Sequence, residues 1–300
     1  MELFTKNSKF VPYKIIKQML SFDNKSSLIR HLASIRDQKI TIGFVPTMGA
    51  LHIGHLSLLS KSLQHNDFTI ISIFINPTQF TNHDDLKNYP RTIDSDIEKI
   101  KIISDQIIIY APSADDIYDG NIISDSYDFD GLEHQMEGKY RPGHFNGVGT
   151  VVKKLFEIVQ PTNAYFGEKD FQQLQIVKKL VAKQKMKVNV IGCEIYREKN
   201  GLAMSSRNER LSKTQRNEAQ VIYKTLQEAK KLFKTKSAQQ LTAFVTTTFN
   251  SQTFFTLEYF EIADENKLIS CIRKSKTKKY RAFIAVFVNS IRLIDTIALY

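Results

Sequence analysis

Two histidines that stand three residues apart are the clearest candidates for chemistry in this 300-residue chain. His52 and His55 follow an apolar run at residues 42–45 and precede a segment whose apolar residues have helical spacing. Where a strand turns into a helix, ligands bind beyond the strand's carboxyl end, facing unpaired N–H groups and the positive end of the helix dipole. Imidazoles placed there can donate hydrogen bonds to phosphate oxygens or supply a proton. The pattern therefore predicts a phosphate site, which is favoured over two surface histidines in a turn.

Two further groups of polar side chains follow expected strands, and a third lies near the expected boundary between the two parts of the chain. Gln79 comes after the apolar residues 68–75, and its amide can both donate and accept hydrogen bonds to a ligand, with a plain polar loop residue as the alternative. Lys169 and Asp170 lie between an expected strand at 163–166 and a helix. Lysine is a mobile cation for phosphate, and the aspartate has helix capping as its alternative role. The third group is Met204, Ser205, Ser206 and Arg207. Its two hydroxyls and its guanidinium suit a polyphosphate.

The first two thirds of the chain must position these groups. Short β-rich runs alternate there with helical patterns, which predicts parallel strands joined by helical crossovers. We expect an α/β fold with a Rossmann-like, doubly wound parallel sheet. The strands are expected at residues 39–45, 68–75, 106–110, 163–166 and 188–191, and the helices at 54–64, 93–103, 147–159 and 171–182.

After about residue 197 the pattern changes to helices followed by strands, which predicts a smaller C-terminal α+β domain. The expected division is residues 1–192 and 193–300, with the group at residues 204–207 near the hinge. The helices are expected at residues 214–235 and 238–250, and the strands at 254–262, 281–288 and 290–294.

Composition excludes several classes of protein. Apolar residues make up 42% and charged residues 24%, which excludes a disordered chain. Cys193 and Cys271 are the only cysteines, too few for a disulfide framework or a CxxC metal site. No run approaches the ~18 apolar residues of a membrane span, and residues 1–10 lack the apolar run of a signal peptide. A soluble, cytoplasmic protein without a membrane partner is expected.

The net charge of +11, from 42 Lys+Arg against 31 Asp+Glu, raises a different possibility. A basic protein can bind nucleic acid, and such binding depends steeply on salt. The excess is mostly lysine scattered along the chain, with one dense run at residues 274–279. Bidentate phosphate recognition favours arginine instead. A solvated, lysine-rich surface is therefore favoured, and no nucleic-acid partner is expected.

The histidine segment also resembles a known family. His52-Ile53-Gly54-His55 matches the HIGH signature of the nucleotidyltransferase superfamily, and the longer string VPTMGALHIGHLSLL at residues 45–59 resembles the pantoate–β-alanine ligases, or pantothenate synthetases. Ile53 departs from the glutamate usual in that family, but we expect its side chain to point away from the phosphates. The resemblance continues in order through FINPTQF (74–80), YPRT (89–92), MEGKYRPGHFNGVGTVVKKLF (136–156), PTNAYFGEKDFQQL (161–174), REKNGLAMSSRN (197–208), LEYFEIAD (257–264) and IRLID (291–295).

The resemblance implies an ATP-dependent condensation of pantoate with β-alanine to give pantothenate, through a pantoyl adenylate and with release of AMP and pyrophosphate. It also implies Mg²⁺ and a homodimer. Because the group at residues 204–207 lies near the expected hinge, we expect closure of the small domain to complete the site and exclude water. By resemblance, the catalytic residues are His52, His55 as the proton donor, Lys169, Ser205 and Arg207. Gln79 and Gln173 would hold pantoate and β-alanine. The expected ATP-binding residues are Met48, Gly49, Ala50, Leu51, His52, Ile53, Gly54, His55, Gly167, Glu168, Lys169, Asp170, Tyr196, Met204, Ser205, Ser206 and Arg207.

Some assignments stay open at this point. Asp94 and Asp96 are candidates for holding magnesium, but carboxylates in the first turn of a helix are equally explained by the helix dipole. Arg141 and His144 are weaker candidates for substrate contact. Another HIGH-type enzyme, such as a class I aminoacyl-tRNA synthetase fragment or a small nucleotidyltransferase, is the alternative function. A ligase releases AMP, whereas a nucleotidyltransferase leaves the nucleotide on its product.

Overall fold

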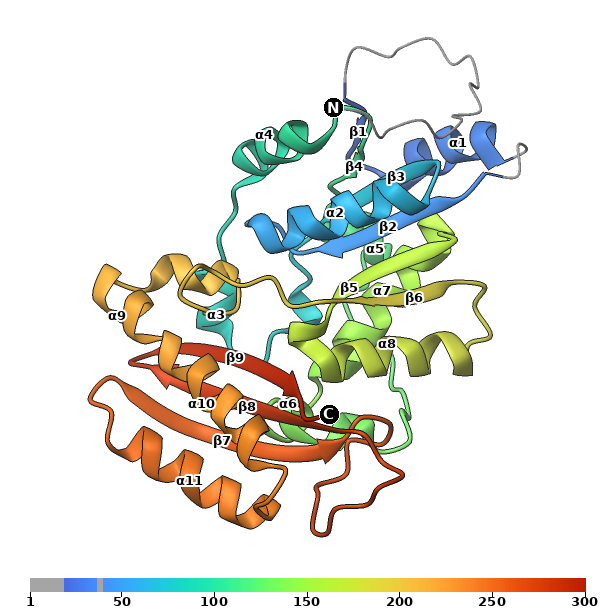
Figure 1. The fold of residues 1–300 in the computed structure, drawn as a ribbon. Helices are drawn as coiled ribbons and strands as arrows, with labels where there is room; N and C mark the ends of the chain where they lie inside the picture. The colour runs from blue at the N-terminus through green and yellow to red at the C-terminus, as the bar shows by residue number, and fades with distance from the viewer. Residues whose placement is uncertain (1–18, 37–39) are drawn as a thin grey trace, which may run out of the picture.

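The computed structural model describes residues 19–36 and 40–300, arranged as Figure 1 shows. The expectation for residues 1–10 and the start of the strand expected at residue 39 lie outside the described residues. Within the described ranges, no helix combines the length and the apolar character needed to cross a bilayer.

Six parallel strands form the large sheet in the order β1-β4-β3-β2-β5-β6, which confirms the expected doubly wound α/β fold. The strands are β1 (Ser21–Phe22), β2 (Ile42–Thr47), β3 (Phe68–Ile73), β4 (Ile108–Tyr110), β5 (Asn163–Gly167) and β6 (Asn189–Cys193). The longer helices are α1 (Lys25–Arg36), α2 (Ile53–His65), α4 (Ile93–Ile103), α7 (His144–Val159) and α8 (Phe171–Lys183). The short helices are α3 (His83–Lys87), α5 (Ala114–Tyr118), α6 (Met136–Tyr140), η1 (Pro77–Gln79), η2 (Leu132–His134), η3 (Glu168–Asp170) and η4 (Ser206–Arg210).

Helices cover both faces of this sheet. Helices α1, α7 and α8 pack on one face, through residues such as Phe156. Helices α2 and α4 pack on the other face through Leu59 and Ile100. Because successive side chains of a strand point to opposite faces, Phe44 of β2 belongs to the first apolar layer and Val45 to the second. Both residues are fully buried, which explains why the strand reads as an unbroken apolar run.

Strand β2 marks the point where the strand order reverses. It pairs with β3 on one side and β5 on the other, in parallel registers that join Phe44 to Ile70 and to Ala164. The connections leaving β2 and β5 lead to α2 and, through η3, to α8, which pack on opposite faces of the sheet. Such a switch point leaves a crevice outside the carboxyl ends of the strands. The predicted phosphate residues of the first part of the chain lie on these two connections.

A three-stranded antiparallel sheet, β7-β8-β9, forms the smaller C-terminal part with its own apolar core (Figure 1, orange to red). The expected α+β arrangement is confirmed, but the single helix expected at 214–235 is two helices that meet at Ala219. Ala219 is fully buried, and its carbonyl accepts the Ile222 N–H three residues on, which tightens the turn. The elements are α9 (Lys213–Glu218), α10 (Gln220–Leu232), α11 (Ala238–Asn250), β7 (Phe255–Asp264), β8 (Tyr280–Val288) and β9 (Ile291–Ala298).

A buried ion pair ties the two parts together. Arg292 donates two hydrogen bonds to the Glu137 carboxylate, at 2.7 and 2.8 Å, and the Tyr259 hydroxyl donates a third at 2.8 Å. Burial opposes ionisation of this carboxyl, but the hydrogen bonds and charge of Arg292 prevail and lower the pKa of Glu137 to about 2. The boundary expected between residues 192 and 193 falls in β6, the last strand of the large sheet, and the division into domains stays a prediction.

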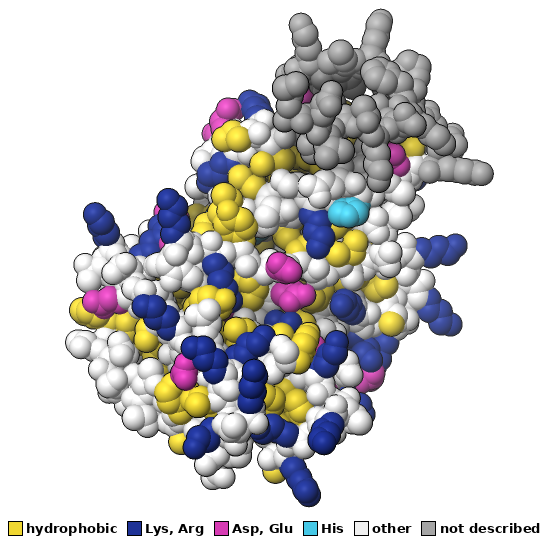
Figure 2. Space-filling model, in the orientation of Figure 1, with side chains coloured by type: hydrophobic (Ala, Val, Ile, Leu, Met, Phe, Trp, Pro, Cys, Tyr) yellow, Lys and Arg dark blue, Asp and Glu magenta, His cyan; other side chains and the backbone are white. Residues whose placement is uncertain are grey.

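Basic side chains are scattered over the face that Figure 2 shows, with several close together over the C-terminal part. In the run at residues 274–279, Lys274 and Lys279 lie over the rings of Phe233 and Tyr300, at 4.4 and 4.8 Å from the ring centroids. Two lysines of the run therefore pack against the protein's own aromatic rings.

Gly147 sets the distance between α7 and the loop that carries Gln79. A Cβ atom at residue 147 would lie 2.3 Å from the carbonyl oxygen of Thr78. We predict that Gly147→Ala lowers the unfolding free energy by about 1–3 kcal/mol, because backbone has to move to admit the methyl group. Urea unfolding measures this loss. Gly167→Ala is the matched control, since its Cβ would meet nothing within 4 Å. An equally stable Gly147→Ala variant would show that this contact is not tight.

Candidate active site

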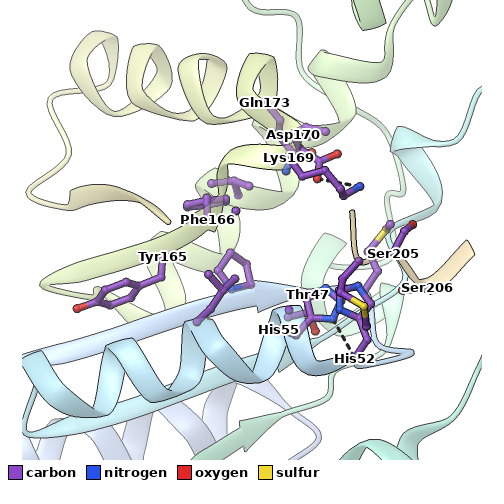
Figure 3. A pocket seen from close by; sticks show the side chains of 18 of the residues that line it. Thr47, His52, His55, Tyr165, Phe166, Lys169, Asp170, Gln173, Ser205 and Ser206 are labelled. Atoms are coloured by element: carbon purple, nitrogen blue, oxygen red, sulfur yellow. Dashed lines mark hydrogen bonds and ion pairs between the residues drawn. The ribbon is translucent and has the colours of Figure 1, made fainter. Parts of the chain in front are cut away.

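A cleft of about 230 Å³ lies at the carboxyl ends of β2 and β5, and both parts of the chain line it. Figure 3 shows side chains from α2, the η3 segment and the segment at residues 204–207 around the cleft. The cleft brings together sequence-predicted residues from five separate segments. They are Met48, His52, Gly54, His55, Gln79, Gly167, Lys169, Asp170, Gln173, Tyr196, Met204, Ser205, Ser206 and Arg207.

Five residues from the expected ATP-binding set are not among those that line the cleft: Gly49, Ala50, Leu51, Ile53 and Glu168. Ile53 is 47% exposed, in keeping with the expectation that it points away from the phosphates. Glu168 accepts a hydrogen bond from Arg281 at 3.1 Å instead. The other three residues form the turn behind the histidines.

This turn has an uncommon backbone shape. Gly49 and Ala50 have φ values of 83° and 50°, so two successive residues are left-handed, and the second of them is not glycine. The N–H groups of Ala50 and Leu51 donate to the two carboxylate oxygens of Asp96, at 2.9 and 2.7 Å. Asp96 is thus occupied by the turn. Nothing in the sequence pattern singles out this contact across 46 positions.

The two histidine rings stack at the beginning of α2, with centroids 4.0 Å apart and planes 23° from parallel. The backbone N–H of His52 donates to Nδ1 of His55 at 3.3 Å. A Cβ atom at residue 54 would lie 2.9 Å from the His52 ring, so glycine at this position leaves room for the stacked pair.

Both imidazoles are poor bases in this setting. Burial lowers the pKa of His52 to about 2, helped by the charges of His55 and Lys169. Burial, with the charges of Lys169 and Lys99, lowers the pKa of His55 to about 4. At pH 7 each ring is therefore neutral and offers one N–H donor.

The η3 segment contributes a cation at the opposite wall of the cleft. The Lys169 ammonium lies 3.3 Å from the Asp170 carboxylate. Asp170 is the N-cap residue of α8, yet its side chain makes no capping hydrogen bond. The capping alternative therefore does not describe this carboxylate, which lines the cleft together with Gln173 one turn further along α8.

The segment at residues 204–207 faces the histidine turn from the C-terminal part. Ser206 Oγ donates to the Ala50 carbonyl oxygen at 3.1 Å, which links the two phosphate-site candidates directly. The Arg207 guanidinium donates to Asp85 of α3 at 2.7 Å, and both side chains are about 30% exposed. Asp85 is a site residue that sequence reasoning missed, because the partners are 122 positions apart.

Gln79 is held in the floor of the cleft by hydrogen bonds on three sides. Its Oε1 accepts from Asn76 at 3.2 Å, and its Nε2 lies 3.0 Å from the Met48 sulfur. Its backbone carbonyl accepts from Nδ1 of His144 at 2.7 Å, while Arg141 lies 3.2 Å from Nε2 of the same ring. Asn76 lines the cleft, and its place in the FINPTQF block was the available signal.

The carboxylates near the cleft do not form a metal cage. Among the described residues, no three His, Cys, Asp or Glu side chains gather into a metal site. Asp94 is exposed on α4, and both oxygens of Asp96 are engaged by backbone N–H groups. The two residues that the sequence left open as magnesium ligands therefore do not fit that role together.

The buried histidines make stability depend on pH. Burial, with the charge of Arg141, lowers the pKa of His144 to about 3, and an unfolded histidine has a value of 6.5. Below pH 6.5 the unfolded chain therefore binds more protons than the folded one, and stability falls as the pH falls. We predict a loss of up to about 1.4 kcal/mol per pH unit for each such histidine between about pH 6.5 and 5. Thermal unfolding measures it, and His144→Gln should flatten the slope. The same substitution at exposed His134 is the control, and equal slopes in both variants would contradict the prediction.

Comparisons with known proteins agree with this geometry. A family model described as pantoate-beta-alanine ligase matches residues 21–298. The chain is 63% identical over 281 residues to the pantothenate synthetase of Flavobacterium psychrophilum, a match that covers 94% of this chain and 100% of the relative. It is 51% identical to the pantothenate synthetase of Christiangramia forsetii, with 94% and 99% covered.

Solved structures share the same fold. Pantothenate synthetase from Thermus thermophilus superposes with a TM-score of 0.85 at 32% identity, covering 94% of this chain and 100% of the other. The pantoate-beta-alanine ligase from Francisella tularensis, solved in complex with beta-gamma ATP and beta-alanine, gives a TM-score of 0.74 at 35% identity, with 94% and 98% covered. Because the family model matches residues 21–298, nearly the whole chain, the chain belongs to the pantoate–β-alanine ligase family.

Proposed function

We propose that this protein condenses pantoate with β-alanine at the cleft between β2 and β5, at the expense of ATP. ATP first activates the pantoate carboxylate as pantoyl adenylate and releases pyrophosphate. The amine of β-alanine then attacks the acyl carbon, the bond to AMP breaks, and pantothenate leaves. The observation that carries the proposal is the convergence of His52, His55, Lys169 and Arg207 on one cleft in a member of this family.

We call the part of the cleft around His52, His55, Lys169 and Arg207 its phosphate end. Only two of these four side chains, Lys169 and Arg207, are permanent cations. We propose that His52, His55, Lys169, Ser205 and Arg207 contact the phosphates, with His55 as the proton donor. The imidazoles are neutral in the free protein. A polyphosphate beside them favours their protonated forms and so raises both pKa values. Charge that moves onto the leaving pyrophosphate then meets donors that are already in place.

We call the part of the cleft around Gln79 and Gln173 its acyl end, and both of these side chains are primary amides. We assign Gln79 and Gln173 to pantoate and β-alanine, because primary amides both donate to and accept from hydroxyl and carboxylate groups. Gln79 is 9% exposed and held by Asn76, so its orientation is fixed before a substrate arrives. Fixed partners lower the entropy lost on binding and favour a reactive alignment of carboxylate and α-phosphorus.

We further propose that residues 1–192 and 193–300 act as two domains, of which the smaller closes on ATP through the segment at 204–207. Closure would keep water from the adenylate. Mg²⁺ bound to the ATP phosphates would screen their charge, and Lys169 and Arg207 would meet the phosphates beside it. A cytoplasmic homodimer is the assembly we propose, and light scattering on the purified protein measures it.

Asp85 should compete with ATP for Arg207. Their ion pair at 2.7 Å joins two side chains that are partly exposed, so it contributes at most about 1 kcal/mol. We predict that Asp85→Asn lowers the KM for ATP by up to about fivefold, because the guanidinium no longer has to leave the Asp85 carboxylate before it binds the ATP phosphates. Steady-state kinetics at fixed salt measures this change. Asp84→Asn on the same short helix is the control, since Asp84 is exposed. An unchanged or higher KM for ATP would refute the competition.

The decisive assay follows the products. Purified protein with ATP, Mg²⁺ and pantoate should release pyrophosphate only to the level of enzyme present, and AMP with pantothenate should require β-alanine. A nucleotide retained on the product would point to a nucleotidyltransferase instead. His55→Ala should slow adenylate formation by at least about 10²-fold if the imidazole gives general acid–base help. The control is His65→Ala, at the other end of α2. A much smaller loss in the His55 variant would leave it a binding role alone.

A further inference from the structure

We propose that Asp96 is a positioning residue for the phosphate end of the cleft. Its buried carboxylate holds the turn at residues 49–51 in the shape that aims His52 and His55 at the cleft. Asp96 does not line the cleft, so it acts through the turn and not on a ligand. The inference rests on the proposed ATP-dependent function, in which the two imidazoles contact the nucleotide.

The carboxylate of Asp96 is fully satisfied by the residues around it. Its side chain is 0% exposed. Oδ1 accepts the Leu51 N–H at 2.7 Å, and Oδ2 accepts the Ala50 N–H at 2.9 Å and the Thr92 hydroxyl at 3.1 Å. Hydrogen bonds to an ionised acceptor are about twice as strong as neutral ones. A buried charge with three donors is therefore anchored firmly to the turn.

Lys99 completes the hold from the next turn of α4. Its ammonium donates to the Leu51 carbonyl oxygen at 2.8 Å and lies 3.8 Å from Oδ1 of Asp96. Two side chains of helix α4 thus form hydrogen bonds with Leu51, one with its N–H and one with its carbonyl oxygen. The ammonium also offsets the negative charge that Asp96 places behind a site for phosphates.

The turn needs such a hold because of its backbone. Ala50 has φ 50°, a left-handed conformation that an L-residue other than glycine seldom adopts without support. Its N–H is fixed by Asp96 and its carbonyl by Ser206 Oγ, at 2.9 and 3.1 Å. Asp96 and the C-terminal part therefore hold the two backbone polar groups of the same residue.

The hydrogen bonds also decide what the turn can offer a phosphate. The Gly49 N–H donates to Thr47 Oγ1 at 3.3 Å, and the His52 N–H donates to His55. With Ala50 and Leu51 bound to Asp96, all four N–H groups of residues 49–52 are used within the protein. The turn therefore acts on ATP through its imidazoles and the first N–H groups of α2. Loss of Asp96 should harm adenylation and spare the β-alanine step.

The test separates the two half-reactions in Asp96→Asn, with Asp94→Asn as the matched control on the exposed side of the same helix turn. Asparagine keeps the shape but turns one acceptor into a donor that faces backbone N–H. We expect kcat/KM for ATP in adenylation to fall roughly 10- to 100-fold. AMP release from preformed adenylate on addition of β-alanine should change less than about threefold.

A second substitution tests the mechanism itself. Glycine adopts left-handed backbone without penalty, so Ala50→Gly in the Asp96→Asn background should recover adenylation at least about fivefold. A purely structural loss of Asp96 would not respond to this change at a temperature where both variants are folded. Adenylation within about threefold of wild type in Asp96→Asn, equal losses in both half-reactions, or no recovery in the double variant would each overturn the proposal.

Amide hydrogen exchange on the unmodified protein covers the case in which Asp96→Asn does not fold. The Ala50 and Leu51 amide protons should exchange at least about a hundredfold more slowly than in an unstructured chain. Exchange at the unprotected rate would overturn the proposal without any variant. If the wild-type protein made no AMP from pantoate, β-alanine and ATP, the proposed function would fail, while this exchange result would still decide whether the Ala50 and Leu51 N–H groups are held in hydrogen bonds.

Discussion

The turn between β2 and α2 is the constraint on which the rest of the site depends. A parallel sheet ends its strands at one edge, so a ligand held there must be reached by short connections leaving those strands. The connection after β2 does this with two left-handed residues, Gly49 and Ala50, before the helix begins. The arrangement positions the stacked histidines at the edge and leaves the backbone N–H groups of Ala50 and Leu51 bound to Asp96. Helix α4, which covers one face of the sheet, thereby also shapes the cleft.

The cleft concentrates positive groups without a matching number of fixed charges. Lys169 lies beside Asp170, and Arg207 lies beside Asp85, so each permanent cation has an anion close by. The two imidazoles avoid mutual repulsion by staying neutral, since burial and nearby ammonium groups lower their pKa values. Such a site avoids strong self-repulsion in the free protein, and under the proposed function it would gain charge when a polyanion binds. Lining the cleft with four permanent cations would instead carry a self-repulsion that the free protein has to bear.

The sequence predicted those features that repeat locally. The alternation of apolar runs and helical patterns indicated the sheet, and the bounds of α4 and α11 agree to the residue. Helix α1 was missed although Leu28, Leu32 and Ile35 carry its buried stripe at helical spacing. Strand β1 has two residues, too few for any periodicity. Asp85 and Asp96 were beyond sequence reasoning for a different reason: an acidic residue near a helix N-terminus has a local explanation, and only the folded chain shows its distant partner.

The net charge of +11 has little to do with this chemistry. Charges further than about 10 Å from the cleft are largely screened at physiological salt, and two lysines of the 274–279 run lie against aromatic rings of the C-terminal part. The groups that we propose to select an anion are the few that the turn, the η3 segment and residues 204–207 place around one cleft. The Ser206 hydroxyl donates to the carbonyl oxygen of Ala50, so the C-terminal part contacts the same turn that Asp96 holds. The closure proposed above would therefore act on the phosphate site through Ala50, where the two parts of the chain meet.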